Sequence, residues 1–294
     1  MTLGPRAKTI IGLFDSGIGG LGVWHEVVRR LPHHPTLYLA DSWHCPYGPR
    51  PAEEIRRFSL GIARFLIERG AGMIVVACNT ASAAGLASLR AVLDVPVVGM
   101  EPAVKPAAQQ TRTGHVGVLA TAGTLSGDLF RNTAARHADG VEVHVQVGEG
   151  LVERVEAGQA NTPETVSLLR TYLQPMLDVG VDQIVLGCTH YSFLTPAIRH
   201  IVPESVSVVD PAGAVARRVE QVLAVKEIEP DYADVFGHWP AATSHFFTSG
   251  QPEMLASAIR DLAGLDPNVE GITWDSTGTQ VVRLTGAYQY GTIP

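Results

Sequence analysis

Two segments that lie 110 residues apart share one pattern, and this duplication limits the possible folds more than any other feature. Residues 70–80 (GAGMIVVACNT) and 180–190 (GVDQIVLGCTH) each begin at glycine, continue as an apolar run, and reach a cysteine followed by polar residues. Short apolar runs bounded by glycine predict strands buried in a parallel sheet. Cys78 and Cys188 would then lie at C-terminal strand ends, each before a stretch able to begin a helix. Because ligands of open α/β sheets bind at that edge, the pair predicts a site with a thiol on either side of one substrate.

The remainder of the chain alternates between strand and helix patterns, which is typical of parallel sheets covered by helices on both faces. Residues 53–69 and 164–178 carry apolar side chains at helical spacing. The segment Asn161-Thr162-Pro163-Glu164 is a favourable helix start, with a capping residue before proline and an acidic residue. Strands are predicted at residues 9–14, 36–40, 73–77, 95–99, 115–120, 141–147, 183–187 and 205–209.

Two further pairs of similar segments support an internal repeat. Residues 11–17 are similar to 116–122, and residues 97–102 are weakly similar to 208–211. Valine-rich strands bounded by glycine look alike in many α/β proteins, but these pairs are separated by nearly the same distance as the two cysteines. We therefore predict an α/β protein with two related lobes, whereas the weakly periodic stretch after Leu265 is either an added sheet edge or a mobile tail.

The composition limits the functional classes. The chain has 294 residues, enough for two lobes with their own cores. It carries a formal net charge of −7 without a basic run, so we expect no nucleic-acid partner. We find no long apolar span and no signal segment, and three cysteines are too few for a secreted disulfide scaffold. The expected location is therefore the cytosol, with free thiols and no membrane contact.

A glycine-rich segment offers an alternative function. Residues 17–22 (GIGGLG) follow a predicted strand and fit the dinucleotide-binding pattern, with Asp41 at the end of the next strand as the ribose-binding acid. However, Asp15 and Ser16 stand between the strand and the first glycine, where a carboxylate would approach the pyrophosphate. The other interpretations are a purely structural turn, or a tight turn that directs Asp15 and Ser16 into the crevice.

The cysteines themselves allow a structural interpretation, because a buried thiol is often only a small apolar side chain. Two thiols at matching strand ends favour a chemical role instead, since a helix N-terminus can lower a cysteine pKa into the functional range. Asn79 and Thr80 after the first cysteine, and Thr189 and His190 after the second, add amide, hydroxyl and imidazole groups.

We expect no metal site. The spacing of Cys188 and His190 is too short for a zinc finger, and Cys45 with Cys78 completes no ligand pattern. The loop Pro46-Tyr47-Gly48 follows Asp41 and is either a simple turn or a substrate-lining loop, with Cys45 beside it as a bystander. Four other histidines are expected on the surface or in packing positions: His33, His34, His137 and His200.

Taken together, the motifs resemble the bacterial glutamate racemase family of the aspartate/glutamate racemase superfamily, in order and in spacing, from about residue 9 to at least residue 262. The segments that carry the resemblance are Asp15-Ser16-Gly17-Ile18-Gly19-Gly20, Pro46-Tyr47-Gly48, Ala77-Cys78-Asn79-Thr80-Ala81, Pro96-Val97-Val98-Gly99, Gly187-Cys188-Thr189-His190-Tyr191 and Phe247-Thr248-Ser249-Gly250.

The resemblance implies a cofactor-independent enzyme that interconverts L- and D-glutamate for peptidoglycan synthesis, with two pseudo-symmetric α/β lobes and the site between them. It implies that Cys78 and Cys188 act as the two acid/base thiols. Asp15, His190 and Glu156 would assist proton transfer. The implied substrate-binding residues are Asp15, Ser16, Pro46, Tyr47, Gly48, Asn79, Thr80, Thr121, Thr189 and His190. A homodimer is also implied.

Two positions depart from the family pattern. Gly148-Glu149 stands where the family usually has Cys-Pro, and Ser192 replaces a common proline. They bear on the backbone near Glu156 and on the pocket for the side-chain carboxylate of the substrate. The predicted boundaries are residues 8–103 with 211–262 for one lobe, 104–210 for the other, and 263–294 for an extension.

Two functional alternatives remain open besides the dinucleotide enzyme. One is a racemase, decarboxylase or isomerase of aspartate or another small diacid, because the length of the substrate side chain cannot be read from these motifs. The other is a two-lobed protein that binds a small molecule without converting it.

Overall fold

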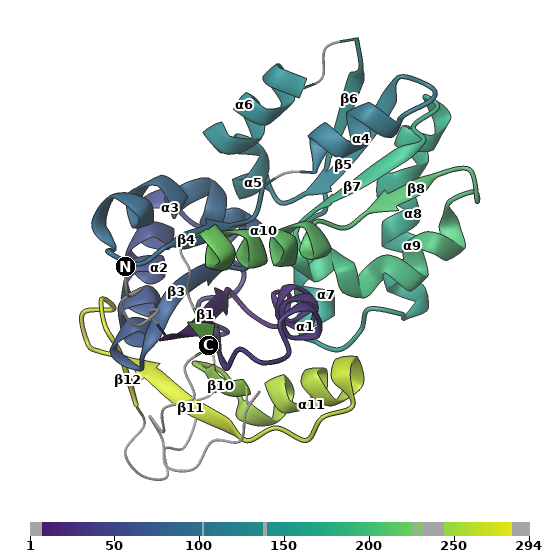
Figure 1. The fold of residues 1–294 in the computed structure, drawn as a ribbon. Coiled ribbons are helices and arrows are strands. Elements are labelled where there is room, and N and C mark those ends of the chain that lie inside the picture. Colours follow the sequence, from purple (N-terminus) through teal and green to yellow (C-terminus); the bar gives the residue numbers. More distant parts are fainter. Residues whose placement is uncertain (1–7, 102, 138–139, 226–228, 231–243, 284–294) are drawn as a thin grey trace.

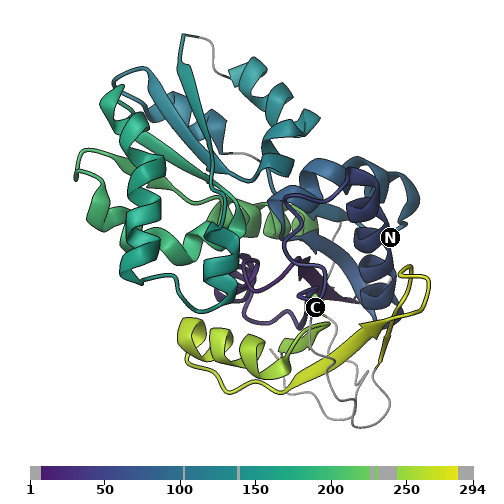
Figure 2. The ribbon, with the colours of Figure 1, turned by 180° about the vertical axis from the view of Figure 1, so that it is seen from behind.

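The protein folds into two mostly parallel sheets flanked by helices. The computed structural model describes residues 8–101, 103–137, 140–225, 229–230 and 244–283. Figure 1 shows one sheet in the lower half of the view, edged by the yellow C-terminal strands, and the other in the upper half. Figure 2 shows the same two halves from behind. The predicted α/β class is confirmed.

The first sheet has eight strands in the order β12-β11-β10-β2-β1-β3-β4, with β9 paired to β1. All its pairs are parallel except the antiparallel pair of β11 and β12. Its strands are β1 (Lys8–Asp15), β2 (Thr36–Ala40), β3 (Ala71–Val76), β4 (Val97–Gly99), β9 (Glu229–Pro230), β10 (Ser244–Thr248), β11 (Val269–Trp274) and β12 (Val281–Arg283).

The second sheet has four parallel strands in the order β6-β5-β7-β8. They are β5 (His115–Ala120), β6 (Glu142–Val147), β7 (Gln183–Gly187) and β8 (Ser207–Val209). The order matches β2-β1-β3-β4 of the first sheet strand for strand, so that β1 corresponds to β5 and β3 to β7. This agreement supports the internal repeat that the sequence predicted.

Helices connect the parallel strands and cover their faces (Figure 1). They are α1 (Leu21–Arg30), α2 (Ala52–Glu68), α3 (Asn79–Val92), α4 (Val104–Gln110), α5 (Ala122–Ser126), α6 (Asp128–His137), α7 (Leu151–Glu156), α8 (Pro163–Asp178), the 3₁₀ helix η1 (Thr189–Leu194), α9 (Thr195–Ile201), α10 (Ala212–Val225) and α11 (Pro252–Ala263). Thr162 caps α8 by accepting the Thr165 N–H at 3.3 Å, as its sequence predicted. None of the described helices is long and apolar enough to cross a bilayer.

A continuous apolar core joins the two halves. It includes Trp24 of α1, Leu173 of α8, Leu194 of η1 and Val219 of α10, all buried. Because α10 follows β8 and packs against α1 and β4, the chain returns from the second sheet to the first through this core. Residues of both halves are therefore packed into one shared core.

The eight predicted strands are all present, with bounds that differ by at most two residues. The sequence analysis did not predict β10 as a strand and left the stretch after Leu265 undecided between an edge and a tail. Residues 269–274 and 281–283 form an added edge of the first sheet. The proposed lobe boundaries remain a prediction; residues 102, 226–228, 231–243 and 284–294, on which parts of them fall, lie outside the described residues.

Candidate active site

The predicted site residues gather where the two sheets meet. Asp15 is the last residue of β1, and Thr121 directly follows β5. Cys78 follows β3 after one intervening residue, and Cys188 directly follows β7. Because β1 and β3 correspond to β5 and β7, the two thiols occupy equivalent places in the repeat, and both are buried.

Cys78 is the N-cap of α3, and its sulfur accepts the Ala81 N–H at 3.4 Å. Its S–H lies 4.0 Å from the hydroxyl of Ser16, to which it donates. Burial raises the pKa of Cys78 well above its usual value, and the charge of Asp15 raises it further. The expected lowering by the helix N-terminus is therefore wrong for Cys78, because desolvation outweighs the N–H donor. The charge of Cys188 contributes to the same increase, so each thiol lies within electrostatic reach of the other.

Asp15 connects the two halves. Its Oδ2 accepts the Gly20 N–H at 2.6 Å and the hydroxyl of Thr189, from the second half, at 3.2 Å. Burial raises the pKa of this carboxyl, and the positive charge of His190 acts against that increase. Asp15 lies close enough to Cys78 for its charge to raise the pKa of that thiol, so it is positioned to assist proton transfer at Cys78.

On the other side, Cys188, His190 and Glu156 form a chain of contacts. The Cys188 sulfur lies 3.9 Å from His190 Nδ1, and Nε2 of the same ring lies 2.5 Å from Glu156 Oε1. Burial lowers the pKa of His190, but its hydrogen bonds to Cys188, Cys45 and Glu156 outweigh burial and raise the pKa well above the usual value. Glu156 Oε1 also accepts the Ile18 N–H of the first half at 2.8 Å. Glu156, which the motif resemblance selected, is therefore in direct contact with His190.

Cys45, which the sequence analysis took as a bystander beside the loop, lies close to two of the predicted catalytic residues. Its sulfur, a Glu156 carboxylate oxygen and a His190 ring nitrogen all lie within 4.8 Å of one another. Burial raises the pKa of Cys45 to about 12, so this thiol stays protonated. A third thiol therefore stands beside His190. The only hint of this position in the sequence is that Cys45 directly precedes the loop at residues 46–48.

A cluster of threonine hydroxyls lies between the halves. The hydroxyl oxygens of Thr80 and Thr121 are 2.9 Å apart, and Thr124, which the sequence analysis did not select, lies 3.0 Å from Thr121. Asn79 Oδ1 is buried and finds no partner among the described residues. A small zwitterion could use these groups, because hydroxyls donate to a carboxylate and a free amide oxygen accepts from an ammonium.

The loop at residues 46–48 is held by a buried carboxylate. Asp41 Oδ2 accepts the Tyr47 hydroxyl at 2.7 Å, while Oδ1 accepts from Ser249 at 2.7 Å and from Trp274 Nε1 at 2.8 Å. The hydroxyl of Tyr47 therefore donates to Asp41, and its role in substrate binding stays a prediction. Pro46 and Gly48 line the same loop, and a Cβ at Gly48 would lie 3.2 Å from Thr121 of the second half.

The glycine-rich loop is explained by close approach of the two halves. A Cβ at Gly17 would meet Glu156 Oε1, and one at Gly19 would lie 2.4 Å from His190 Nδ1. The N–H groups of Ile18 and Gly20, which a pyrophosphate would need, already bind the carboxylates of Glu156 and Asp15. The dinucleotide interpretation is therefore not supported, and Asp41 holds the neighbouring loop instead of a ribose.

The two departures from the motif pattern have local consequences. The Tyr191 hydroxyl donates to Gly148 O at 2.9 Å, and a Cβ at Gly148 would lie 2.5 Å from that hydroxyl. Gly148 thus lets Tyr191 approach the turn that leads into α7, which carries Glu156. Ser192 faces Gly22 of α1, where an added Cβ would be 3.8 Å from the Ser192 Cβ.

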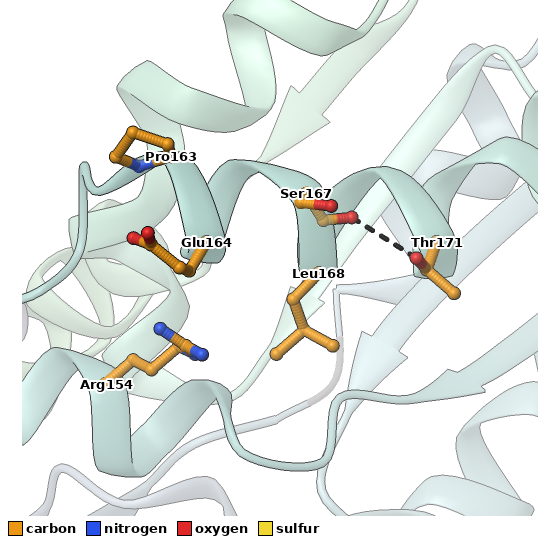
Figure 3. A pocket seen from close by; sticks show the side chains of 6 residues that line it. All are labelled: Arg154, Pro163, Glu164, Ser167, Leu168 and Thr171. Carbon is orange, nitrogen blue, oxygen red and sulfur yellow. Dashed lines mark hydrogen bonds between the residues drawn. The ribbon is translucent and has the colours of Figure 1, made fainter.

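A separate hollow lies on the outer surface between α7 and α8. Figure 3 shows Arg154 opposite Glu164, with Leu168 and Thr171 further along α8. Its volume is about 520 Å³, and none of the predicted site residues lines it. Of the histidines expected outside the site, His33 and His200 are exposed and His34 is half-buried, while the side chain of His137 lies outside the described part.

The comparisons with known proteins agree with this arrangement. A family profile described as Asp/Glu/hydantoin racemase matches residues 23–219. The chain belongs to this family. The racemase family includes a glutamate racemase from Roseiflexus sp. (strain RS-1) that is 49% identical over 86% of this chain and 91% of its own length. A glutamate racemase from Pseudomonas aeruginosa (strain PAO1) is 45% identical over 88% of this chain and 96% of its own length.

Solved racemase structures share the fold. Glutamate racemase isoform RacE1 from Bacillus anthracis superposes with a TM-score of 0.79 at 31% identity, covering 91% of this chain and 98% of that one. Escherichia coli glutamate racemase, solved in complex with L-glutamate and the activator UDP-MurNAc-Ala, gives a TM-score of 0.77 at 32% identity, covering 92% and 99%.

Proposed function

We propose that this member of the racemase family is a glutamate racemase that moves the α-proton with two cysteines. The observation that carries the proposal is the pair of buried thiols, Cys78 and Cys188, at equivalent strand ends of the two halves. Relatives that are 45–49% identical over most of the chain bear the name glutamate racemase. The solved E. coli relative binds L-glutamate, which supports this substrate over aspartate.

Racemisation removes a proton from one face of Cα and delivers a proton to the other. A thiolate on one face takes the α-proton as the C–H bond breaks, and its sulfur becomes a thiol. The thiol on the opposite face gives its proton to Cα and becomes a thiolate. The site therefore ends each turnover with its one shared proton on the other sulfur, ready for the opposite enantiomer.

The surroundings of Cys78 and Cys188 differ, and this difference bears on which thiol is protonated before the reaction begins. Asp15 and burial keep Cys78 protonated. On the other side His190, held by Glu156, lies 3.9 Å from the Cys188 sulfur. We infer that Cys78 is the acid in the resting form, which leaves proton abstraction to Cys188. Before a second turnover in the same direction, the Cys188 thiol releases its proton to solvent and the Cys78 thiolate takes up a proton from solvent.

The substrate groups have complementary partners in the same region. Gathered hydroxyls of Thr80, Thr121 and Thr124 are suited to the α-carboxylate, whose charge grows as Cα loses its proton. Asn79 Oδ1, which has no hydrogen-bond partner within the described part of the chain, is suited to the ammonium group. Ser16 and Thr189, buried on either side, complete the predicted contacts. Such fixed donors supply charge stabilisation that tuning of the thiols alone cannot give.

Polarimetry on the purified protein tests the proposal. We expect L-glutamate to lose its optical rotation completely, with L-aspartate converted far more slowly. Cys78→Ser and Cys188→Ser should each abolish racemisation, whereas the matched Cys45→Ser variant should retain more of it because neither proton-transfer position changes. Faster conversion of L-aspartate would overturn the substrate, and normal racemisation by either of the first two variants would overturn the two-thiol mechanism.

Two consequences of the resemblance stay predictions. Supply of D-glutamate for peptidoglycan predicts that expression of the chain rescues a bacterial strain that requires D-glutamate for growth. The expected homodimer is tested by the mass of the purified protein in solution.

A further inference from the structure

A second cluster of metal-ligating side chains lies away from the thiols, on the second sheet. His115 and Glu142 are the first residues of the neighbouring parallel strands β5 and β6 and lie opposite each other in the register. His144 is two residues further along β6, on the same face as Glu142. Thr121 follows the other end of β5, so the cluster lies at the opposite edge of the sheet from the candidate active site.

The three ligand atoms are already close together. His115 Nδ1 lies 3.1 Å from His144 Nε2 and 3.6 Å from Glu142 Oε2, and His144 Nε2 lies 3.7 Å from Glu142 Oε1. Ligands of tetrahedral zinc, bound at about 2.0–2.1 Å, are about 3.3 Å from one another. The observed distances lie on both sides of this value, so small rotations of the side chains suffice to bring all three onto one ion.

We propose that His115, Glu142 and His144 form a binding site for a divalent transition-metal cation of the zinc class. Two imidazoles and one carboxylate favour zinc, cobalt, nickel or copper over calcium and magnesium, which prefer oxygen ligands. The three side chains are all partly exposed, so an ion enters directly from solvent and a water molecule takes the fourth position.

The site joins an edge strand to its neighbour. In the second sheet β6 is an outer strand, held on one side by β5. An ion bound by His115 of β5 and by the two β6 residues ties these strands together at their N-terminal ends. Binding therefore stabilises the fold by mass action, because the unfolded chain does not hold the three ligands together. It leaves proton transfer at the other edge of the sheet unchanged.

Cobalt and zinc titrations of the full-length protein test the site, with His144→Asn as the ligand variant and His200→Asn as the matched control. His200 is exposed on α9 and belongs to neither metal-ligating cluster. We expect the wild type and His200→Asn to bind one Co²⁺ with the weak absorption of nitrogen and oxygen ligands, and Zn²⁺ to raise their unfolding temperature. In His144→Asn the affinity should fall more than about 10-fold, as loss of a ligand costs at least as much as loss of its supporting contacts. Equal binding by His144→Asn and the wild type would overturn the proposal.

The thiol cluster of Cys45, Glu156 and His190 is distinguished by its spectrum and by its effect on activity. An ion held there gives an intense sulfur-to-cobalt absorption and blocks racemisation. The proposed site gives neither, and metal-free His144→Asn should racemise glutamate at the wild-type rate. The proposal is wrong if the sulfur-to-cobalt absorption is the only cobalt signal and is the same in the wild type and in His144→Asn.

Discussion

Replacing Glu156 by Gln tests how far one carboxylate supports the second half of the site. The carboxylate lies 2.5 Å from His190 Nε2 and accepts the Ile18 N–H at 2.8 Å. Gln keeps an oxygen for Ile18 but removes the charge that stabilises the imidazolium. A hydrogen bond to a charged group contributes about 1.5–3 kcal/mol, and about 1.4 kcal/mol is a tenfold change in rate. We therefore expect kcat/KM to fall by about 10- to 150-fold.

The pH dependence of kcat/KM in Glu156→Gln is an independent test of the same contact. Hydrogen bonds to Cys188, Cys45 and Glu156 raise the pKa of His190 in the wild type, so the protonated ring persists to higher pH than for a free histidine. Without the carboxylate this pKa falls, and the alkaline limb of kcat/KM should move to lower pH. The free energy of unfolding depends on pH for the same reason. A histidine whose pKa is raised on folding stabilises the fold at pH values below its unfolded pKa of about 6.5, and this stabilisation is lost as the pH rises through its folded pKa. The variant should therefore lose more stability at pH 6 than at alkaline pH.

Circular dichroism of each enantiomer measures both directions of the reaction. Glu153→Gln, on the exposed face of the same helix, is the matched control and should behave as the wild type. The two enantiomers have equal free energy, so kcat/KM must fall equally in both directions, which checks the assay internally. A Glu156→Gln enzyme with the wild-type kcat/KM and pH profile would refute the reasoning, and equal losses in both variants would assign the effect to α7 as a whole.

Three other predictions concern the contacts around the site and a buried turn. Gly19→Ala places a Cβ 2.4 Å from His190 Nδ1, so the variant should keep its far-ultraviolet circular dichroism and lose most activity; wild-type rates would contradict the close packing. Trp274→Phe removes a donor to Asp41 and should lower the free energy of unfolding, measured in urea, by about 1–3 kcal/mol. The variant should also have a raised KM, and an unchanged KM would show that strand β11 does not support substrate binding. Hydrogen bonds from the turn before β5 outweigh burial and lower the pKa of Asp182, so the stabilisation is present above the unfolded value of about 3.9 and is lost as pH falls below it. Asp182→Asn should therefore be less stable than the wild type at pH 7, and a difference that does not shrink below pH 4 would contradict this sign.

The sequence predicted the elements whose signals are local. The eight predicted strands are short segments rich in apolar, often β-branched residues, so their limits could be predicted without knowledge of their neighbours. The positions of Cys78 and Cys188 followed from those limits, because the C-terminal edge of a parallel sheet is fixed once its strands are known. The capping residue before Pro163 likewise predicted the start of α8 from the local sequence alone.

The remaining features depend on contacts between distant parts of the chain. Asp41 accepts from Ser249 and Trp274, which lie 208 and 233 positions away, so its role in holding the residue 46–48 loop had no local signal. Cys45 approaches His190 only because of the way in which the two sheets meet. The pKa of Cys78 was predicted in the wrong direction, since the depth of burial is a property of the assembled fold and not of the helix that follows.

Deuterium incorporation during the first part of the reaction with L-glutamate in D₂O tests the two-thiol mechanism most directly. If one sulfur removes the proton and the other delivers one from solvent, the D-glutamate formed carries deuterium at Cα while the recovered L-glutamate keeps its hydrogen. We predict this one-sided labelling at initial rates. Deuterium that enters the recovered L-glutamate as fast as D-glutamate appears would show that a single base exchanges with solvent, and would contradict the assignment of Cys78 and Cys188 to opposite faces.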